Sequence, residues 1–282
     1  MTQVVSNAQR NLAGAKQPKP KKFRTRRDVV ICQVLVSVVL IVAWQTISGT
    51  LVDAFWISRP SDIIAYIYDW VFFGDFWKHF GFTMTATFIG FGTGAIGGFI
   101  AGLLLGRAEF WAMVLDPFLV AINGIPRVAL APLFVVWFGI GLLPKVVLVF
   151  TLVFFVIFYN TYSGVKSVER HHIDLARVMG ANDSFLFRKV ILPAALPYIF
   201  LGIKLSIPYA LIGAIIGEFV ASSAGLGWKI QVETSLYNTN GTMAGLVVLM
   251  LIVTAMNWVL DRIERRLLSW RPQRRGSGVD IA

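Results

Sequence analysis

The stretch FTMTATFIGFGTGAIGGFIAGLLLG, residues 82–106, repeats a glycine at every fourth position and carries no charged residue. It is long enough to cross a bilayer core as a helix, which needs about 20 mainly apolar residues. Residues four apart share one face of a helix, so these glycines form a smooth ridge that another helix can approach closely. The ridge consists of Gly90, Gly94, Gly98, Gly102 and Gly106. It predicts a tight seam, either with a neighbouring helix of the same chain or, alternatively, between two subunits.

The composition of the whole chain is that of an integral membrane protein. Of the 282 residues, 56% are hydrophobic and 15% are charged, whereas about a quarter of the residues of a soluble domain are charged. The single cysteine, Cys32, excludes an internal disulfide and a cysteine-based metal site. The formal net charge of +11 would suit nucleic-acid binding, but the basic residues gather at the chain ends and in one loop. We therefore expect a membrane protein without a nucleic-acid partner.

Six segments are apolar and long enough to cross a membrane, which predicts an all-α membrane protein with six transmembrane helices. The third contains Pro126 and Pro132, which we expect to interrupt it. The last continues as a charged helix toward Trp270. The six segments cover about residues 29–48, 82–105, 113–138, 146–162, 198–221 and 244–260.

Lysine and arginine beside the spans predict the orientation, because cytoplasmic loops carry the excess of these residues. They are concentrated before the first span, in the loop after the fourth span and after the last span. Both termini are therefore expected in the cytoplasm. We divide the chain into a disordered basic cytoplasmic arm (1–28) resting on anionic lipid, a transmembrane domain (29–270) and a cytoplasmic tail (271–282).

The loop of residues 164–193 is too polar to cross the membrane, and its pattern predicts two short helices. Gly180 suits the left-handed position that ends the first helix. A capping residue among 182–184 begins the second helix, which we expect Pro193 to end. The residues alone leave two interpretations open: helices lying on lipid headgroups, or a rigid elbow that contacts a cytoplasmic partner.

The motif DLARVMG at residues 174–180, followed by VILP at 190–193, resembles the EAA loop of the permease subunits of bacterial binding-protein-dependent ABC importers. Asp174, Leu175 and Val190 depart mildly from the usual Glu, Ala and Ile. The resemblance extends from about Ser61 to Trp270, and further motifs in the family order resemble its nitrate, taurine and alkanesulfonate branch. These motifs are PRVALAP at 126–132, WFG at 137–139, ILPAALP at 191–197 and ASSAGLG at 221–227.

The resemblance implies the ABC importer permease fold in the bacterial cytoplasmic membrane, with coupling helices in residues 164–193 that dock in separate ATPase subunits. ATP and Mg would bind those subunits rather than this chain. It also implies a periplasmic or lipid-anchored solute-binding protein, and a second permease subunit, with a homodimer favoured. The solute would be a small anion such as nitrate, taurine or a sulfonate. The coupling role is carried over to Asp174, Ala176, Gly180, Ala181, Asn182, Asp183, Leu192 and Pro193.

Polar residues inside the spans are costly in lipid and often line a pathway, which makes Asn123, Arg127 and Glu218 candidates for the translocation path. Arg127 follows the interruption in the third span and could present its guanidinium to an anion. It could equally pair with Glu109, Asp116 or Glu218, or snorkel to the interface. Glu218, near the outer end of the fifth span, could gate the path or brace the loop after it.

The sequence contains no residue pattern that would support catalysis. The chain contains neither the G-x-x-x-x-G-K-[S/T] phosphate loop nor a G-x-S-x-G nucleophile elbow, and its histidines lack metal-ligand spacing. The alternatives to an ABC permease are a secondary transporter or channel driven by ion gradients, and a membrane scaffold. A secondary carrier should show carboxylates inside the membrane, where Glu218 stands nearly alone. Lys204, near the cytoplasmic start of the fifth span, is expected to snorkel.

Overall fold

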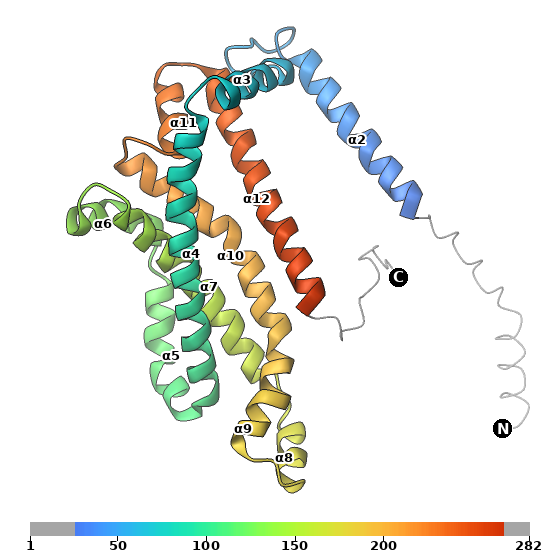
Figure 1. The fold of residues 1–282 in the computed structure, drawn as a ribbon, viewed down its shortest axis with the longest axis vertical. Helices are drawn as coiled ribbons and strands as arrows, with labels where there is room; N and C mark the ends of the chain where they lie inside the picture. Colours follow the sequence, from blue (N-terminus) through green and yellow to red (C-terminus); the bar gives the residue numbers. More distant parts are fainter. Residues whose placement is uncertain (1–25, 268–282) are drawn as a thin grey trace, which may run out of the picture.

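The computed structural model describes residues 26–267, which fold almost entirely into helices (Figure 1). The basic arm up to residue 25 and the predicted tail at 271–282 lie outside these described residues. Residues 26–28, predicted as part of the disordered arm, already belong to the first helix of the described chain, α2 (Arg26–Ile47). The all-α membrane fold class is confirmed.

Five helices between residues 26 and 267 are apolar and long enough to cross a membrane. A bent pair of shorter helices makes a sixth crossing if the two are counted together. The six predicted spans are therefore recovered only with that pair included. The single spans are α2, α4 (Phe76–Arg107), α7 (Leu143–Lys166), the continuous helix 183–220, and α12 (Thr239–Leu267).

The bent pair replaces the predicted third span. Helix α5 (Glu109–Asn123) is followed by a 3-10 turn, η1 (Arg127–Leu130), and by α6 (Ala131–Phe138), and the two arms differ in direction by 72°. The break lies at residues 124–126, as expected for Pro126. Pro132 was wrongly expected to interrupt the span, because it lies in the first turn of α6, where a missing N–H costs little.

The fifth span begins earlier than predicted. Helix α9 (Asp183–Leu186) continues through a π-helical turn, η2 (Phe187–Ile191), into α10 (Leu192–Val220). Pro193 was wrongly expected to end the second loop helix. The π turn changes the hydrogen-bond register just before Pro193, which then lies in the first turn of α10.

Helices α4, α7 and α10 form the centre of the bundle, and the glycine ridge of α4 faces α7 of the same chain. A Cβ atom on Gly94 would lie 3.0 Å from the Phe150 carbonyl oxygen, and one on Gly102 would lie 2.8 Å from that of Phe158. The two backbones therefore touch along the ridge, which leaves no room there for a second subunit. The buried residues beside the seam are Ala86, Val149, Val153, Ile157, Ala210 and Ala214.

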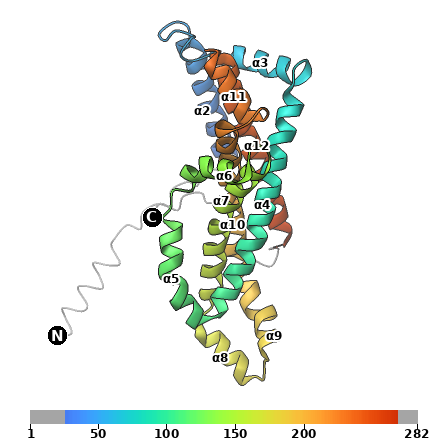
Figure 2. The same ribbon diagram turned by 90° about the vertical axis from the view of Figure 1, so that its left-hand side faces the viewer.

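Four short helices lie at the two ends of the bundle, and one of them, α9, is the start of the fifth span (Figure 1 and Figure 2). The helices α3 (Pro60–Phe72) and α11 (Leu226–Ser235) cover the upper end, while α8 (Arg170–Val178) and α9 form the lower tip. The sequence pattern predicted the lower pair and missed the upper pair. Pro60, in the first turn of α3, is a helix-start signal that could have revealed one of them.

Two features of the outer helices concern their surroundings. None of the apolar window of α2 is buried, and in Figure 1 this helix stands apart from the bundle. It therefore requires lipid or another protein around it. Lys204 of α10 pairs with Asp261 at 2.6 Å and with Glu264, both on α12, and its snorkelling stays a prediction.

Candidate functional site

The loop predicted as an elbow is two helices joined by a capped turn. Gly180 has a φ angle of +86°, the left-handed conformation that was predicted for it. Its N–H donates to the Arg177 carbonyl at 2.9 Å, and the N–H of Ala181 donates to that of Ala176 at 3.0 Å. These two bonds form a Schellman cap, which fixes the direction in which the chain leaves α8. Asn182 then caps α9 by accepting from the Phe185 N–H at 2.8 Å.

The elbow (residues 170–191) is held against the spans by an apolar cluster, whereas its tip is exposed. The cluster consists of Val165, Leu186, Ile191, Ala195 and Ile199, with Ala176 and Leu192 packed at its edge. At the tip, Val178 is 86% exposed and Met179 is 80% exposed. The apolar tip thus projects from a firmly packed base.

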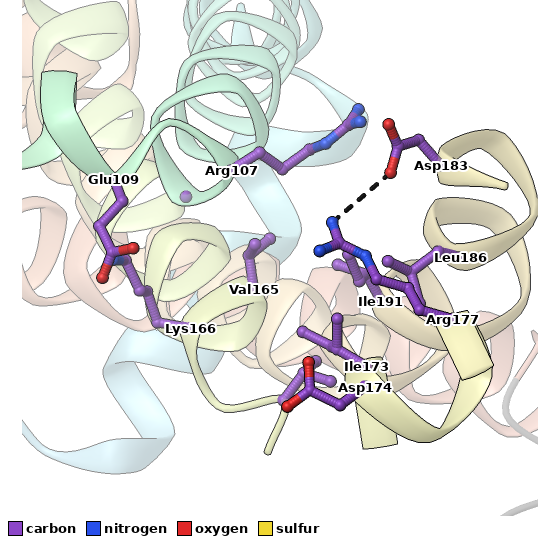
Figure 3. A pocket seen from close by; sticks show the side chains of 12 residues that line it. Arg107, Glu109, Val165, Lys166, Ile173, Asp174, Arg177, Asp183, Leu186 and Ile191 are labelled. Atoms are coloured by element: carbon purple, nitrogen blue, oxygen red, sulfur yellow. Dashed lines mark ion pairs between the residues drawn. The ribbon is translucent and has the colours of Figure 1, made fainter. Parts of the chain in front are cut away.

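A cavity of about 560 Å³ separates the elbow from the ends of α4, α5 and α7 (Figure 3). Asp174 and Asp183 both line it, and Asp183 lies 3.6 Å from the guanidinium of Arg177. Both groups of this ion pair are exposed, so it contributes little to stability. The cavity leaves space into which the elbow can shift.

The eight candidate coupling residues occupy three places. Ala176, Gly180, Ala181 and Asn182 line one hollow at the tip. Asp174 and Asp183 face the cavity behind the elbow. Leu192 and Pro193 lie in the helix that returns to the membrane.

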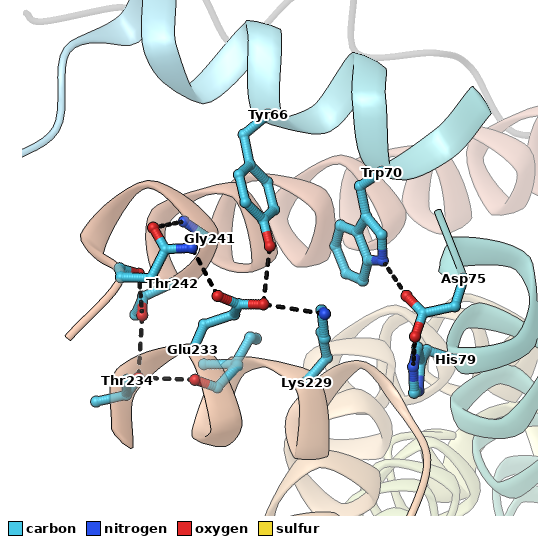
Figure 4. A network of polar contacts seen from close by, with 11 residues as sticks. Tyr66, Trp70, Asp75, His79, Lys229, Glu233, Thr234, Gly241 and Thr242 are labelled. Carbon is cyan, nitrogen blue, oxygen red and sulfur yellow. Dashed lines mark hydrogen bonds and ion pairs between the residues drawn. The ribbon is translucent and has the colours of Figure 1, made fainter. Parts of the chain in front are cut away.

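The opposite end of the molecule is joined by a polar network (Figure 4). Glu233 of α11 accepts from the Tyr66 hydroxyl of α3 at 2.8 Å, from Lys229 at 3.0 Å and from the Asn238 amide at 2.7 Å. Burial alone would raise the pKa of Glu233, but these donors outweigh it and hold the pKa below its ordinary value. Burial and the neighbouring carboxylate raise the pKa of Tyr66, so its hydroxyl remains a donor.

A second set of polar contacts at this end runs from Asp75 to the loop after the fifth span. Asp75 accepts from the Trp70 indole at 2.9 Å and pairs with His79 Nε2 at 2.8 Å. Burial would raise the pKa of Asp75, but these two hydrogen bonds lower it below the ordinary value. The other ring nitrogen of His79 accepts from the Gly225 N–H at 3.0 Å. The two ring nitrogens of His79 therefore bridge Asp75 and this loop.

Glu218 is fully buried at the same end of the molecule. Its carboxylate accepts from the Thr83 hydroxyl of α4 and from the Gly227 N–H, each at 2.7 Å. Lys145, also buried, donates to Ser222 at 2.8 Å in the same loop. Glu218 was considered either as a gate on the translocation path or as a residue that holds the following loop in place. These contacts match the second role.

Arg127 lies at the break between α5 and α6. Its guanidinium donates to the Asn123 side-chain oxygen at 2.6 Å and stacks over the Phe155 ring, 4.2 Å from the centroid. Between residues 26 and 267, no carboxylate forms an ion pair with Arg127. The structure therefore brings Asn123 and Arg127 together and places Glu218 elsewhere.

Comparison with known proteins agrees with this architecture. Residues 94–269 match the family described as "Binding-protein-dependent transport system inner membrane component". The chain belongs to this family. The permease shares 32% identity with the putative aliphatic sulfonates transport permease protein SsuC of Bacillus subtilis (strain 168), over 91% of each chain. The family and these permease relatives identify it as a permease subunit of an ABC importer and do not favour an ion-gradient-driven carrier.

Other relatives differ in the solutes that their names give. The riboflavin transport system permease protein RibX of Chloroflexus aurantiacus is 34% identical over 82% of this chain and 87% of that one. The taurine transport system permease protein TauC of Escherichia coli (strain K12) is 26% identical over 86% and 90%. Among solved structures, an inward-facing conformation of the MetNI methionine ABC transporter superposes with a TM-score of 0.57 at 24% identity, covering 66% of this chain and 92% of that one. That likeness supports the fold.

Several polar residues of the permease were missed by sequence reasoning. Lys145 and His79 are buried in apolar helices. A charged or titratable residue in such a helix is itself a signal of a functional or structural role. Asn160, Tyr159 and Tyr209 line a hollow with Arg127. Their proximity depends on the packing of three helices, so no local pattern could predict it.

Proposed function

We propose that this permease imports a small organic anion of the sulfonate class, driven by ATP hydrolysis on separate subunits that dock on the elbow. ATP and Mg would bind those subunits. The observation that carries the proposal is the capped elbow with its exposed apolar tip, at the end of the molecule farthest from α3 and α11.

The elbow geometry favours a protein partner over lipid headgroups. An interfacial helix lies flat, with its apolar side along the membrane surface. Here α8 and α9 protrude from the bundle (Figure 2), and the exposed Val178 and Met179 lie at the end of α8. The Schellman turn fixes the direction in which the chain leaves α8. A rigid apolar projection can dock in a cleft of an ATPase subunit. Closure of the ATPase would then push the elbow and shift the spans toward one of their two conformations.

We further propose that a second copy of the permease covers the open face of α5 and α6. Apolar side chains there are strongly exposed, among them Phe110, Phe118, Val136 and Trp137. A pathway formed between two subunits would run along this face, while membrane lipid surrounds the remainder. The glycine ridge is not available for this contact, since α7 fills it.

Both termini are proposed to be cytoplasmic, with the solute-binding protein docking at the opposite end on α3 and α11. Charge supports this orientation: the elbow and the end of α12 carry the basic residues, such as Arg188 and Arg265, as the positive-inside rule requires. Reporter fusions after Gly49 and after Arg275 should report opposite sides of the membrane. The same side for both would contradict the orientation.

The sulfonate class is supported by the sulfonate and taurine relatives, whereas the riboflavin relative supplies a different candidate. The test is reconstitution of the permease in proteoliposomes with its ATPase subunits and its solute-binding protein. Taurine or ethanesulfonate should be taken up and should stimulate ATP hydrolysis, and riboflavin should do neither. Stimulation by riboflavin alone would overturn the substrate class.

A further inference from the structure

A hollow of about 280 Å³ lies midway along the membrane-spanning helices of the permease. Phe155, Tyr159 and Asn160 line it from the middle of α7, and Tyr209 lines it from the middle of α10. Asn123 and Arg127 close it from the break between α5 and α6. In Figure 2, α6 crosses the bundle at the level where α5 ends. The break thus brings polar side chains to a depth at which they are costly in lipid.

Arg127 lines this hollow, and most of its hydrogen-bond donors have no protein acceptor among residues 26–267. Its two hydrogen bonds within residues 26–267 both run from Nη2 to Asn123, so Nε and Nη1 have no protein acceptor there. A guanidinium carries five N–H donors in a planar fork. Asp116, on the same helix as Asn123, is exposed and is not part of the lining.

The fixed position of the guanidinium separates it from an arginine that snorkels. Its Cζ atom stacks 4.2 Å from the Phe155 centroid, and the Asn123 oxygen holds one end of the fork. The side chain is half-buried, so it is neither sealed in the protein core nor directed into bulk water. Such an arginine is prepared to form charge-assisted bonds with an anion that enters.

We propose that Arg127, oriented by Asn123, is an anion-recognition site that binds the oxyanion head of the solute midway through the permease. The fork geometry suits a sulfonate, whose oxygens can accept two parallel N–H bonds. Phe155 and Tyr209 provide aromatic walls for the carbon chain, and the Tyr159 hydroxyl and Asn160 amide supply neutral polar contacts. This assignment deepens the proposed function and rests on it for the sulfonate class.

The first test compares uptake by the reconstituted importer with ethanesulfonate as the probe. Arg127→Gln should lower uptake at least about tenfold, because a charge-assisted bond is worth about 1.5–3 kcal/mol. Assembly of Arg127→Gln with the ATPase subunits, read as the monodisperse yield of the complex, should stay within twofold of the unaltered importer. Arg127→Lys should be intermediate, since it keeps the charge and loses the fork. The matched control is Arg262→Gln, which removes a guanidinium stacked 4.4 Å from the Trp258 ring at an exposed site on α12. It should transport normally.

The second test reads binding without transport. In a Cys32→Ser background, Leu205→Cys places the only thiol beside the hollow, where Leu205 is 48% exposed. Millimolar ethanesulfonate should slow maleimide labelling of that thiol, whereas the neutral analogue ethanesulfonamide should not. Equal effects of the two compounds, or protection that persists in Arg127→Gln, would overturn the site.

The outcomes also separate this site from the proposed function. Normal ethanesulfonate uptake by Arg127→Gln would overturn the site and leave sulfonate import standing. If the unaltered importer takes up no sulfonate, the proposed substrate class fails, and the labelling test still decides whether the hollow binds an anion. If Arg127→Gln fails to assemble, the labelling comparison with unaltered Arg127 decides alone.

Discussion

The two ends of this permease are stabilised in opposite ways: the end with α3 and α11, which we propose to be the outer end, and the end with the elbow, which we propose to be the cytoplasmic end. At the outer end, buried Glu218, Lys145 and His79 tie α4, α7, α10 and the 221–227 loop together, while Glu233 joins α3 to α11. At the cytoplasmic end, the Arg177–Asp183 ion pair of the elbow is exposed, and the elbow is held by an apolar cluster and a backbone cap. Buried polar networks stabilise only one arrangement, because each unsatisfied group is costly, whereas apolar contacts tolerate small shifts. The comparison indicates a rigid outer block and a movable lever.

The seam between α4 and α7 connects these two ends, and breaking it should have the largest effect. In Gly98→Leu, the new Cβ would clash with the Phe154 carbonyl oxygen and lie 3.1 Å from the Phe158 nitrogen. Backbone atoms cannot rotate away, so we expect a loss of about 3 kcal/mol or more and little folded protein. The measurement is the monodisperse yield in gel filtration.

Gly92→Leu is the matched control for the seam. It places the same side chain on the same helix, where a Cβ would meet nothing within 4 Å. Its yield should equal that of the unaltered permease. Similar losses for both substitutions would mean that α4 is sensitive to bulk in general and not at the seam.

The second largest effect should come from removing the buried carboxylate of Glu218 at the outer end. Glu218→Ala leaves the Gly227 N–H and the Thr83 hydroxyl without their acceptor, which should cost about 2–5 kcal/mol. Glu218→Gln should cost less, since its amide oxygen can still accept from one donor. Thermal unfolding in detergent measures both variants, with the exposed Asp69→Ala as control.

The elbow serves as a second readout for the same variant. If the two ends are built independently, the fraction of Glu218→Ala that folds should capture the ATPase as well as the unaltered permease does. Weaker capture per folded molecule would show that the outer network also fixes the elbow, contrary to the comparison.

The sequence predicted the parts of this permease that depend on local periodicity or backbone conformation. The glycine ridge, the apolar spans and the Gly180 cap all follow from residues within a few turns of one another. The outer network could not be predicted in this way, because His79 and Gly225 are 146 residues apart. Pro193 misled for a related reason: the rule that proline ends a helix considers one local hydrogen bond, and the preceding π turn changes that bond.

The elbow cap should show a moderate effect on folding and a severe effect on coupling. Gly180→Val forces a β-branched residue into the left-handed region, at a cost of about 1–2 kcal/mol, although the surrounding space is open. The second elbow helix should then leave α8 at the wrong angle. We expect the protein to insert while ATPase capture and uptake fall to background.

Gly180→Asn tests whether coupling depends on the left-handed backbone at this position, because asparagine tolerates that conformation better than valine does. It should recover most uptake. If the valine variant inserts, holds its partner and still transports, the coupling role of the elbow is wrong.

The smallest effect should come from the contact between α3 and α11 at the outer end, where Tyr66→Phe removes one hydrogen-bond donor to Glu233. One hydrogen bond to a carboxylate is worth about 1.5–3 kcal/mol. Lys229 and Asn238 still donate to Glu233 in this variant, so we expect a smaller loss of about 1 kcal/mol at pH 7.

The pH dependence of the stability gives the sharper test. The pKa of Glu233 is lowered in the folded state, so its ionised form stabilises the protein above the ordinary glutamate value of about 4.3, and this stability is lost as the pH falls through the lower folded value. Without the Tyr66 hydroxyl the folded pKa lies closer to the ordinary value, so the acid loss is smaller and is complete at a higher pH. The gap in melting temperature between the two proteins should therefore be widest near pH 7 and narrow below about pH 4, while the exposed Tyr68→Phe control shows no gap. A gap that stays constant with pH would mean that Tyr66 acts only by packing and that Glu233 is not the ionised centre of this contact.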